Sequence, residues 1–457
     1  MRVFAAVLAF GLALRLVVLA TSSELGLVIF DERHFTQLAS SLLHGNGFAW
    51  GPGDPTSLRP PAYPLMIAGI WSVTSEGNLQ AIRAVQILLA MLTTLAVYEL
   101  GRRVFDRTTG VVAASVVWLY PSLIYLNFTI LTETLFTFLL TLFLLLAVML
   151  VQRPGMTIAA SCGLALGLGA LTRSVLWPLP LLLCPLLLAI LPGSLRRRVL
   201  LSTVVFAGYA IVVMPWAVRN TRLQQVVTVV DTIGGMNLRM GNYEYTPEDR
   251  MWDAVALTGE KNWVHALTQE GHAAGANITE GQKEKWAQRK AVEYMLANPG
   301  ITARRAVIKF WDFWGLERSF VAGLQQGIYH PPRWFGVMAS AAIIVTCVAV
   351  MIAGAIGLWV ARPDWRVHIL MLLPIVVITG VHTIVFGHAR YHKPLVPIVA
   401  IYAAAWMVQW QRRNLPRPSR AAMVGAALSV VILLAGWGRQ ALVVEGDRLR
   451  SLMATLW

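Results

Sequence analysis

The chain has 457 residues, of which 57% are hydrophobic and only 13% are charged. Soluble globular domains carry about 25% charged residues, and a fold of this length has too little interior to hide so many apolar side chains. The composition therefore excludes a soluble protein and predicts an all-helical integral membrane protein. The formal charge of +15 is explained by positively charged loops, so no nucleic-acid partner is expected.

Apolar runs of roughly 20 residues, the length that crosses the hydrocarbon core, recur along the chain. We predict about eleven transmembrane helices, at residues 3–21, 80–100, 110–126, 134–151, 156–172, 175–192, 199–216, 335–360, 367–386, 394–410 and 421–437. The first run lacks a small-residue cleavage site, so it is expected to be a retained helix. The shorter apolar run at 60–73 begins with two prolines and is expected to be interfacial or re-entrant.

Basic residues at alternate ends of these runs predict the orientation. With eleven spans, one side carries Arg2, Arg102, Arg103, Arg107, Arg153, Arg196, Arg197, Arg198, Arg362, Arg366, Arg412, Arg413, Arg417 and Arg420. Only Asp106 and Asp364 oppose them, so the positive-inside rule makes this side cytoplasmic. The expected organisation is a transmembrane catalytic module at 1–216 with an external loop at 22–79, an external helical insertion at 217–334, and C-terminal spans at 335–457.

A short amphipathic helix is expected in the first external loop, from Phe30 to Leu43, because apolar residues recur there at helical spacing before Gly45. Asp31 lies at its start, and two interpretations stay open. The carboxylate caps the helix by accepting a backbone N–H, or it is a general base held at the edge of the bilayer.

Glu133 is a second carboxylate of interest, because it lies between two apolar spans. An acid beside hydrocarbon is costly unless it has a partner or a task. The alternative is an acid at a helix start that the helix dipole favours.

Six cations lie at the external ends of apolar runs: Arg59, Arg173, Arg219, Arg222, Arg390 and Lys393. Any one of them could extend to lipid phosphates. Together, beside two carboxylates, they predict an anion site at the outer leaflet, because arginine holds phosphate through two parallel hydrogen bonds.

No metal site is assigned from the sequence. His388 and His392 are four residues apart and could share a helix face, but no third ligand is evident. The three cysteines lie within apolar runs, which argues against a disulfide framework or a metal cluster. Gly163 and Gly167 have the spacing of a close helix–helix contact.

Loose motifs follow one another in a specific order over residues 1–240 and return at 388–400. They are Asp31-Glu32, Gly45-Asn46-Gly47-Phe48, Leu58-Arg59-Pro60-Pro61-Ala62-Tyr63-Pro64, Leu131-Thr132-Glu133-Thr134, Leu171-Thr172-Arg173, Pro215-Trp216-Ala217-Val218-Arg219-Asn220 and Arg390-Tyr391-His392-Lys393-Pro394. In this order they resemble the GT-C membrane glycosyltransferases, in the branch of the lipid A aminoarabinose transferase and the protein O-mannosyltransferases.

The resemblance implies transfer of a sugar from a polyprenyl-phosphate carrier to a lipid, glycan or protein acceptor, on the periplasmic face of a bacterial inner membrane. It implies that Asp31 is the catalytic carboxylate, that Glu133 holds the second acidic position, and that Arg59 contacts the lipid phosphate. Further phosphate partners, implied by position, are Arg173, Arg219, Arg390 and Lys393. Supporting residues are Glu32, Tyr63 and His392.

The expected chemistry is a single displacement that inverts the anomeric carbon, with no cofactor. The leaving lipid phosphate needs cations, and the acceptor needs a base. Two alternatives remain: a multispan transporter or flippase of a lipid-linked sugar, and a non-catalytic partner of a polymer ligase. Transporters usually place charges at the bilayer midplane and contain internal repeats, neither of which is evident here.

Overall fold

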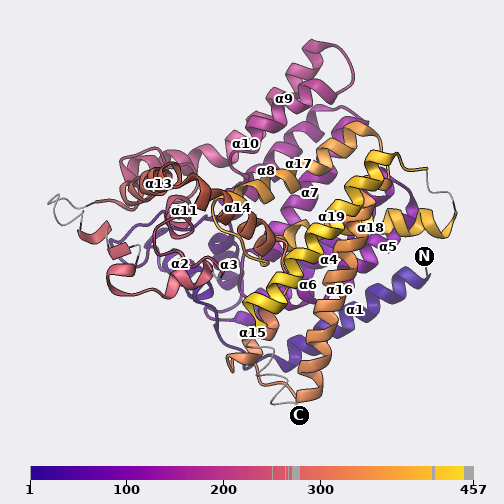
Figure 1. Ribbon diagram of the computed structural model, residues 1–457. Coiled ribbons are helices and arrows are strands. Elements are labelled where there is room, and N and C mark those ends of the chain that lie inside the picture. Colours follow the sequence, from indigo (N-terminus) through magenta and orange to yellow (C-terminus); the bar gives the residue numbers. More distant parts are fainter. Residues whose placement is uncertain are drawn as a thin grey trace.

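The computed structural model describes residues 2–249, 251–262, 264–265, 267–269, 278–413 and 417–446. Over these ranges the chain is helical, and its β-structure is limited to one isolated bridge between Ala49 and Pro55. Figure 1 shows the long helices packed into a bundle, with α11, α13 and α14 gathered on one side of it. The predicted all-α membrane architecture is confirmed.

The first half of the chain forms ten α-helices within the described residues. They are α1 (Arg2–Thr21), α2 (Phe30–Leu43), α3 (Ala62–Val73), α4 (Leu79–Val104), α5 (Arg107–Leu119), α6 (Pro121–Leu126), α7 (Glu133–Gln152), α8 (Met156–Thr172), α9 (Pro180–Ile190) and α10 (Leu195–Gln224).

The second half begins with the insertion at 217–334 and ends with four helices of 16 to 28 residues. The α-helices are α11 (Gly234–Met240), α13 (Glu280–Ala297), α14 (Pro299–Phe313), α15 (Ser319–Gln325), α16 (Arg333–Val360), α17 (Trp365–Ile384), α18 (Val396–Gln411) and α19 (Arg420–Arg439). Shorter 3₁₀ or π turns lie at Ser174–Leu176, Met251–Ala256, Gly259–Lys261, Lys393–Leu395 and Gln440–Val444.

Seven of the described helices are long and apolar enough to cross a membrane: α1, α4, α7, α10, α16, α17 and α19. The other four predicted spans fall on helices that are shorter than 18 residues, namely α5, α8, α9 and α18. The predicted count of eleven is therefore not confirmed. Proline explains why one predicted span is too short. The run at 110–126 is divided into two helices because Tyr120, which precedes Pro121, has an extended backbone.

Helices α8 and α10 approach each other closely, as the glycine spacing predicts. A Cβ atom on Gly163 would lie 2.1 Å from the carbonyl oxygen of Val205, and one on Gly167 would lie 2.8 Å from Cβ of Val212. Gly208 on α10 faces the same contact, where an added Cβ would lie 2.7 Å from the carbonyl oxygen of Ala160. This packing fixes the end of α8, where Arg173 follows.

Buried polar side chains hold the segment that leads into α7. Arg15 donates to the Asn127 side chain at 2.9 Å, and Gln86 donates to the carbonyl oxygens of Asn127 (3.0 Å) and Thr129 (2.9 Å). These bonds satisfy backbone groups that would otherwise be buried without partners. They set the position from which Glu133 begins α7.

The amphipathic helix predicted at 30–43 is α2, and the short apolar run is α3. They pack against each other through a cluster that includes Phe35, Ala39, Tyr63 and Ile67. This contact holds the start of α2, with Asp31, against the helix bundle.

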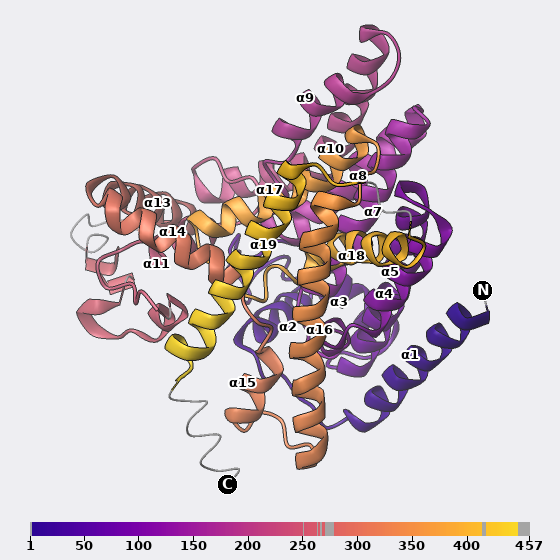
Figure 2. The same cartoon turned by 45° about the vertical axis from the view of Figure 1, so that its right-hand side comes forward.

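The insertion is tied to the first external loop by Glu280, at the start of α13. Its carboxylate accepts hydrogen bonds from the Thr56 hydroxyl at 2.6 Å and the Ser57 amide at 2.7 Å. The division at 216/217 stays a prediction, and α10 continues past it to Gln224. Figure 2 shows α11, α13 and α14 together, apart from the long axis of α16.

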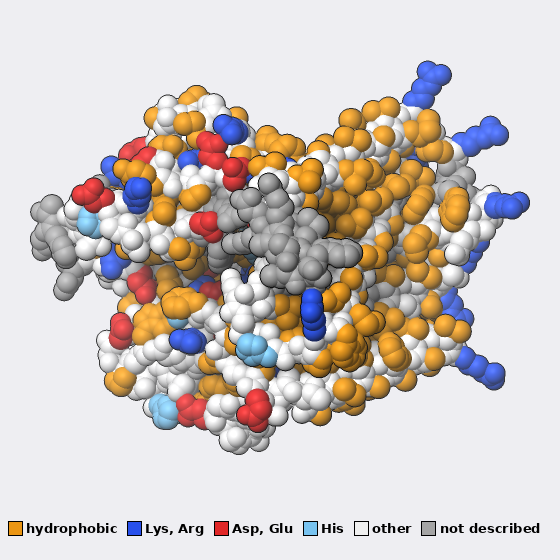
Figure 3. All heavy atoms as spheres, turned by 60° about the horizontal axis from the view of Figure 1, so that its bottom comes forward, with side chains coloured by type: hydrophobic (Ala, Val, Ile, Leu, Met, Phe, Trp, Pro, Cys, Tyr) orange, Lys and Arg blue, Asp and Glu red, His pale blue; other side chains and the backbone are white. Residues whose placement is uncertain are grey.

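The surface separates by side-chain type. In Figure 3, lysine and arginine side chains project at one end beyond a broad apolar surface, while acidic side chains gather at the opposite end. Which end faces the cytoplasm stays a prediction from the positive-inside rule.

Candidate active site

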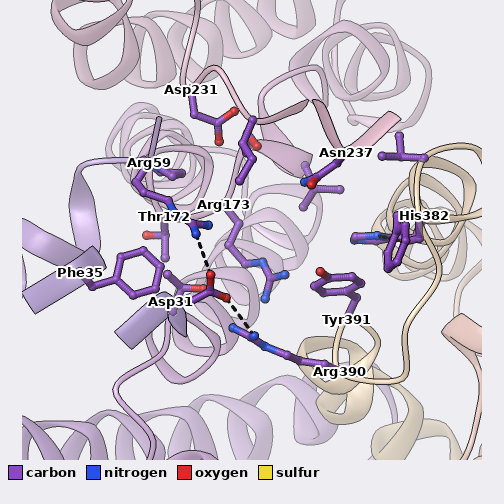
Figure 4. A pocket seen from close by; sticks show the side chains of 17 residues that line it. Asp31, Phe35, Arg59, Thr172, Arg173, Asp231, Asn237, His382, Arg390 and Tyr391 are labelled. Carbon is purple, nitrogen blue, oxygen red and sulfur yellow. Dashed lines mark hydrogen bonds and ion pairs between the residues drawn. The ribbon is translucent and has the colours of Figure 1, made fainter. Parts of the chain in front are cut away.

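A cavity of about 140 Å³ opens where several helix ends meet. Charged residues from five separate parts of the chain line it, and Figure 4 shows their side chains converging. The charged lining residues are Asp31, Arg59, Arg173, Asp231 and Arg390. They lie at the start of α2, in the loop before α3, after α8, before α11 and after α17.

Asp31 bridges two arginines. One carboxylate oxygen lies 2.6 Å from Nη2 of Arg59, and the other lies 3.1 Å from Nη1 of Arg390 (Figure 4). Burial alone would raise the pKa of Asp31, but the two guanidinium groups hold it below its usual value. Asp31 is therefore an ionised carboxylate at neutral pH.

Glu32, rather than Asp31, caps helix α2. Its carboxylate accepts the backbone N–H groups of Val28 at 2.6 Å, Ile29 at 2.8 Å and Ile130 at 2.8 Å. The interpretation of Asp31 as the capping residue is wrong, because the neighbouring acid takes that place. This leaves both oxygens of Asp31 directed at arginines.

Glu133 is fully buried and continues the series of ion pairs. Arg390 donates to both of its oxygens, with Nη2 to Oε2 at 3.3 Å. Nη1 of Arg173 lies 3.1 Å from Oε1. Glu133 and Asp31 together raise the pKa of Arg390 above its usual value, although burial alone would lower it. The charges thus alternate as Arg59, Asp31, Arg390, Glu133 and Arg173.

Aromatic rings hold Arg173 in place. Its guanidinium carbon lies 5.1 Å from the centre of the Tyr391 ring and 5.6 Å from that of Phe136. His382 stacks on the other side of Tyr391 at 4.4 Å. Nη1 of Arg173 is buried without a well-aligned hydrogen bond, so its N–H groups are able to donate to a further acceptor.

His34 is a further neighbour of Arg59 that the sequence did not single out. Both Nε and Nη2 of Arg59 point at Nδ1 of His34, at 3.3 Å and 3.1 Å. Burial and the charge of Arg59 lower the pKa of His34, so the ring is neutral and Nδ1 accepts.

Asp231 is a charged residue of the cavity that sequence reasoning missed. It comes from the insertion, is 8% exposed, and has a pKa that burial raises to about 7. A carboxyl group that is partly protonated at neutral pH can both donate and accept hydrogen bonds. The sequence feature that could have pointed to it is its position as an isolated acid directly after the apolar run Val226–Val230.

Arg219 lies outside this cavity. Its guanidinium donates to the carbonyl oxygens of Thr56 at 2.7 Å and Phe48 at 2.9 Å, and it stacks on Trp216 at 4.6 Å. The expectation that four arginines converge thus holds for Arg59, Arg173 and Arg390 only. Arg219 instead fixes the first external loop against α10.

Three other predicted residues are also buried away from the cavity lining. Tyr63 donates to Gln86 at 2.9 Å within the packing of α3 against α4. His392 and Lys393 lie beside Glu317: Nε2 of His392 is 2.9 Å from the Glu317 carboxylate, and the charge of Glu317 acts on Lys393.

The chain is similar to a described protein family and to solved structures. Residues 58–218 match the family described as dolichyl-phosphate-mannose-protein mannosyltransferase, a stretch that contains Arg59, Glu133 and Arg173. No curated protein matches the chain. Among solved structures, the apo oligosaccharyltransferase of Archaeoglobus fulgidus has a TM-score of 0.50 and 14% identity, covering 95% of this chain and 56% of that chain.

The chain has the fold of the GT-C glycosyltransferases. Another GT-C structure, ArnT from Cupriavidus metallidurans bound to undecaprenyl phosphate, has a TM-score of 0.43 and 13% identity, covering 87% of this chain and 77% of that chain. At 14% identity, the likeness to the archaeal oligosaccharyltransferase establishes the fold alone. The chain spans little more than half the length of the archaeal oligosaccharyltransferase.

Proposed function

We propose that this GT-C protein transfers a sugar from a polyprenyl-phosphate carrier to an acceptor at the outer face of the membrane. The observation that carries the proposal is the alternating series of Arg59, Asp31, Arg390, Glu133 and Arg173 beside one cavity. The series has three arginines and two carboxylates, and this excess of positive charge favours binding of a phosphate group. The family matched at 58–218 also supports a lipid-phosphate donor.

The proposed reaction is one inverting displacement. An acceptor oxygen attacks the anomeric carbon, and Asp31 takes the proton of that oxygen. The bond between the anomeric carbon and the phosphate oxygen breaks, and its electron pair leaves with the polyprenyl phosphate. Arg59, Arg173 and Arg390 stabilise the charge that develops on this leaving group. Arg219 and Lys393 are not needed for this step.

The ion pairs of Asp31 suggest how it becomes a base. In the free protein, two arginines lower its pKa, which weakens its tendency to take a proton. A donor phosphate that binds Arg59 shares the guanidinium that Asp31 otherwise holds. The carboxylate then loses part of its counter-charge and becomes more basic once the donor is bound.

We place the reaction on the periplasmic side of a bacterial inner membrane, opposite the basic face. The predicted division assigns donor chemistry to 1–216 and acceptor choice to 217–334. Asp231, which comes from the latter segment and lines the cavity, supports that assignment. The acceptor class is a lipid, a glycan or a protein.

The position of the charged groups favours a transferase over a transporter or flippase. Glu133 begins α7, Arg173 follows the end of α8, and Arg390 follows α17. These groups therefore lie at helix ends rather than midway along a span, where transporters commonly bind their substrates.

The substitution Asp31→Asn tests the proposal. Cells lacking the gene would receive the parent gene, Asp31→Asn, or Asp54→Asn, which changes an exposed acid of the same loop. We expect mass spectrometry of outer-face glycolipids and glycoproteins to show a sugar-bearing species that needs the parent protein. Asp31→Asn should lower its rate of formation by roughly 10²–10⁴-fold, the usual effect of losing a general base. Full transfer by folded Asp31→Asn protein would contradict the assignment of Asp31. Loss of sugar translocation without any transferred product would favour the flippase.

A further inference from the structure

A second buried cluster of reactive side chains lies next to the candidate active site. It consists of Glu317, which follows α14, Cys347, which lies within α16, and His392, which follows Arg390 by two residues. One ligand atom from each residue lies within 4.8 Å of the other two. All three side chains are fully buried. Segments that are far apart in the chain thus bring together an oxygen, a sulfur and a nitrogen.

The hydrogen bonds of His392 fix which ring nitrogen carries a proton. Nδ1 lies against the carbonyl oxygen of Phe313, which can only accept, so Nδ1 must donate. In a neutral ring, Nε2 then presents its lone pair to Oε1 of Glu317, 2.9 Å away. Two acceptors cannot face each other at this distance, so a proton or a cation has to lie between them.

The same orientation is the one that metal-binding histidines adopt. Such a histidine usually donates its other ring N–H to a backbone carbonyl or a carboxylate, which fixes the ring for coordination. Glu317 has a corresponding support, since the Tyr120 hydroxyl donates to Oε1 at 3.0 Å. Its second oxygen, Oε2, is buried without a hydrogen-bond partner of good geometry, although the Ser122 hydroxyl lies nearby.

We propose that Glu317, Cys347 and His392 form a zinc site that joins the external insertion to the helix bundle beside the candidate active site. Zinc binds thiolate, imidazole and carboxylate ligands. Its bonds to nitrogen and oxygen are about 2.0–2.2 Å, so two tetrahedral ligands lie roughly 3.3 Å apart. The separation of Nε2 and Oε1 needs to open by only a few tenths of an ångström.

The charges balance without further change. When Zn²⁺ enters, the Cys347 thiol loses its proton and the proton between His392 and Glu317 leaves, so one divalent ion replaces two protons. The net charge beside Lys393 is therefore the same before and after binding. The three residues supply three of the four ligands of a tetrahedral zinc ion, and a water molecule would complete the set.

The site would act on the geometry of the candidate active site, because His392 and Arg390 lie on the same short loop. Zinc would hold this loop to Glu317 and Cys347 and thereby set where Arg390 meets Asp31 and Glu133. The sequence alone assigned no metal, since it paired His392 with His388 and found no third ligand. Tertiary packing instead brings two partners to His392 from other segments, namely Glu317 and Cys347.

Metal analysis of the purified full-length protein tests the proposal. After exposure to zinc and gel filtration, the parent should retain about one zinc ion per chain. Cys347→Ser and His392→Gln should lower that content several-fold. The matched control is Cys162→Ser, because Cys162 is equally buried but lies in α8, outside the cluster. Equal loss in Cys162→Ser and Cys347→Ser would overturn the proposal.

Cobalt provides a second measurement, which reports directly on the thiolate ligand. Parent protein stripped with a chelator and loaded with Co²⁺ should show a near-ultraviolet thiolate-to-cobalt charge-transfer band, which Cys162→Ser should keep and Cys347→Ser should lose. Absence of the band from folded parent protein, together with absence of retained zinc, would remove the site. This readout does not depend on glycosyl transfer, so the zinc site can fail while the proposed function stands.

Discussion

At the scale of single residues, adjacent acids have different surroundings. The carboxylate of Glu32 accepts three backbone N–H groups, whereas that of Asp31 faces two guanidinium groups. The difference arises because successive residues of a helix point about 100° apart. Glu32 therefore holds α2 against the segment before α7, and Asp31 remains directed into the cavity.

Arg59 is predicted to bind the carrier phosphate. Arg59→Ala should weaken binding of undecaprenyl phosphate to the purified protein by roughly 10- to 150-fold, since a charge-assisted hydrogen bond contributes about 1.5–3 kcal/mol. Arg33→Ala is the matched control, because Arg33 is exposed on the same helix as Asp31. Titration of the purified proteins in detergent with undecaprenyl phosphate would show the difference in affinity. Equal affinity of Arg59→Ala and the parent would mean that Arg59 only orients Asp31.

Asp231 is predicted to make stability depend on pH. Its pKa of about 7 in the folded protein exceeds the ordinary value of 3.8, so the folded state binds a proton that the unfolded state has lost. Stability should therefore fall as pH rises from about 4 to about 7, with a slope of up to about 1.4 kcal/mol per unit, and level off above that. Thermal unfolding of Asp231→Asn should show a flatter profile between pH 5 and 7. Asp253→Asn, which changes an exposed acid, should keep the parental slope.

At the scale of helices, small residues and prolines decide how the elements meet. Proline ends α5 before α6 and begins α9 and α14, where its missing N–H costs no hydrogen bond. Glycine allows α8 and α10 to touch backbone to backbone. These contacts bring the end of α8, and Arg173 with it, to the cavity.

Gly163 is predicted to be intolerant of even one methyl group. Gly163→Ala would place Cβ 2.1 Å from the Val205 carbonyl oxygen, so α8 and α10 must separate. We expect a loss of about 1–3 kcal/mol, the usual cost of overpacking, seen as a lower melting temperature in detergent. Gly69→Ala in α3 is the control, because an added Cβ there meets nothing within 4 Å. Similar melting temperatures for the two variants would contradict the close contact.

At the scale of the whole molecule, the charges divide the protein into two faces. Basic side chains project beyond the apolar surface at one end (Figure 3). The ion pairs of the candidate site lie at helix ends near the insertion. A membrane whose inner surface is negative favours the basic end on the cytoplasmic side.

This orientation predicts which cysteines a reagent can reach. In whole cells, an impermeant thiol reagent should label Gln288→Cys, on exposed α13, and should not label Ser194→Cys before the membrane is opened. The parent, with Cys162, Cys184 and Cys347 buried or partly buried, provides the background. Labelling of Ser194→Cys alone would reverse the orientation and place the candidate site in the cytoplasm.

The amino-acid sequence alone predicts the membrane class, the positions of most helices and the gathering of charges at helix ends. These properties follow from local composition and periodicity, which each segment carries by itself. Only the tertiary structure decided which charges meet. Arg390 reaches Asp31 across 359 positions of the chain, while Arg219 turns to nearby backbone carbonyls. The capping role of Glu32, the place of Asp231 in the cavity and the contact of His392 with Glu317 and Cys347 also depend on helix packing. Such contacts depend on how distant helix ends are brought together, and no local pattern records that.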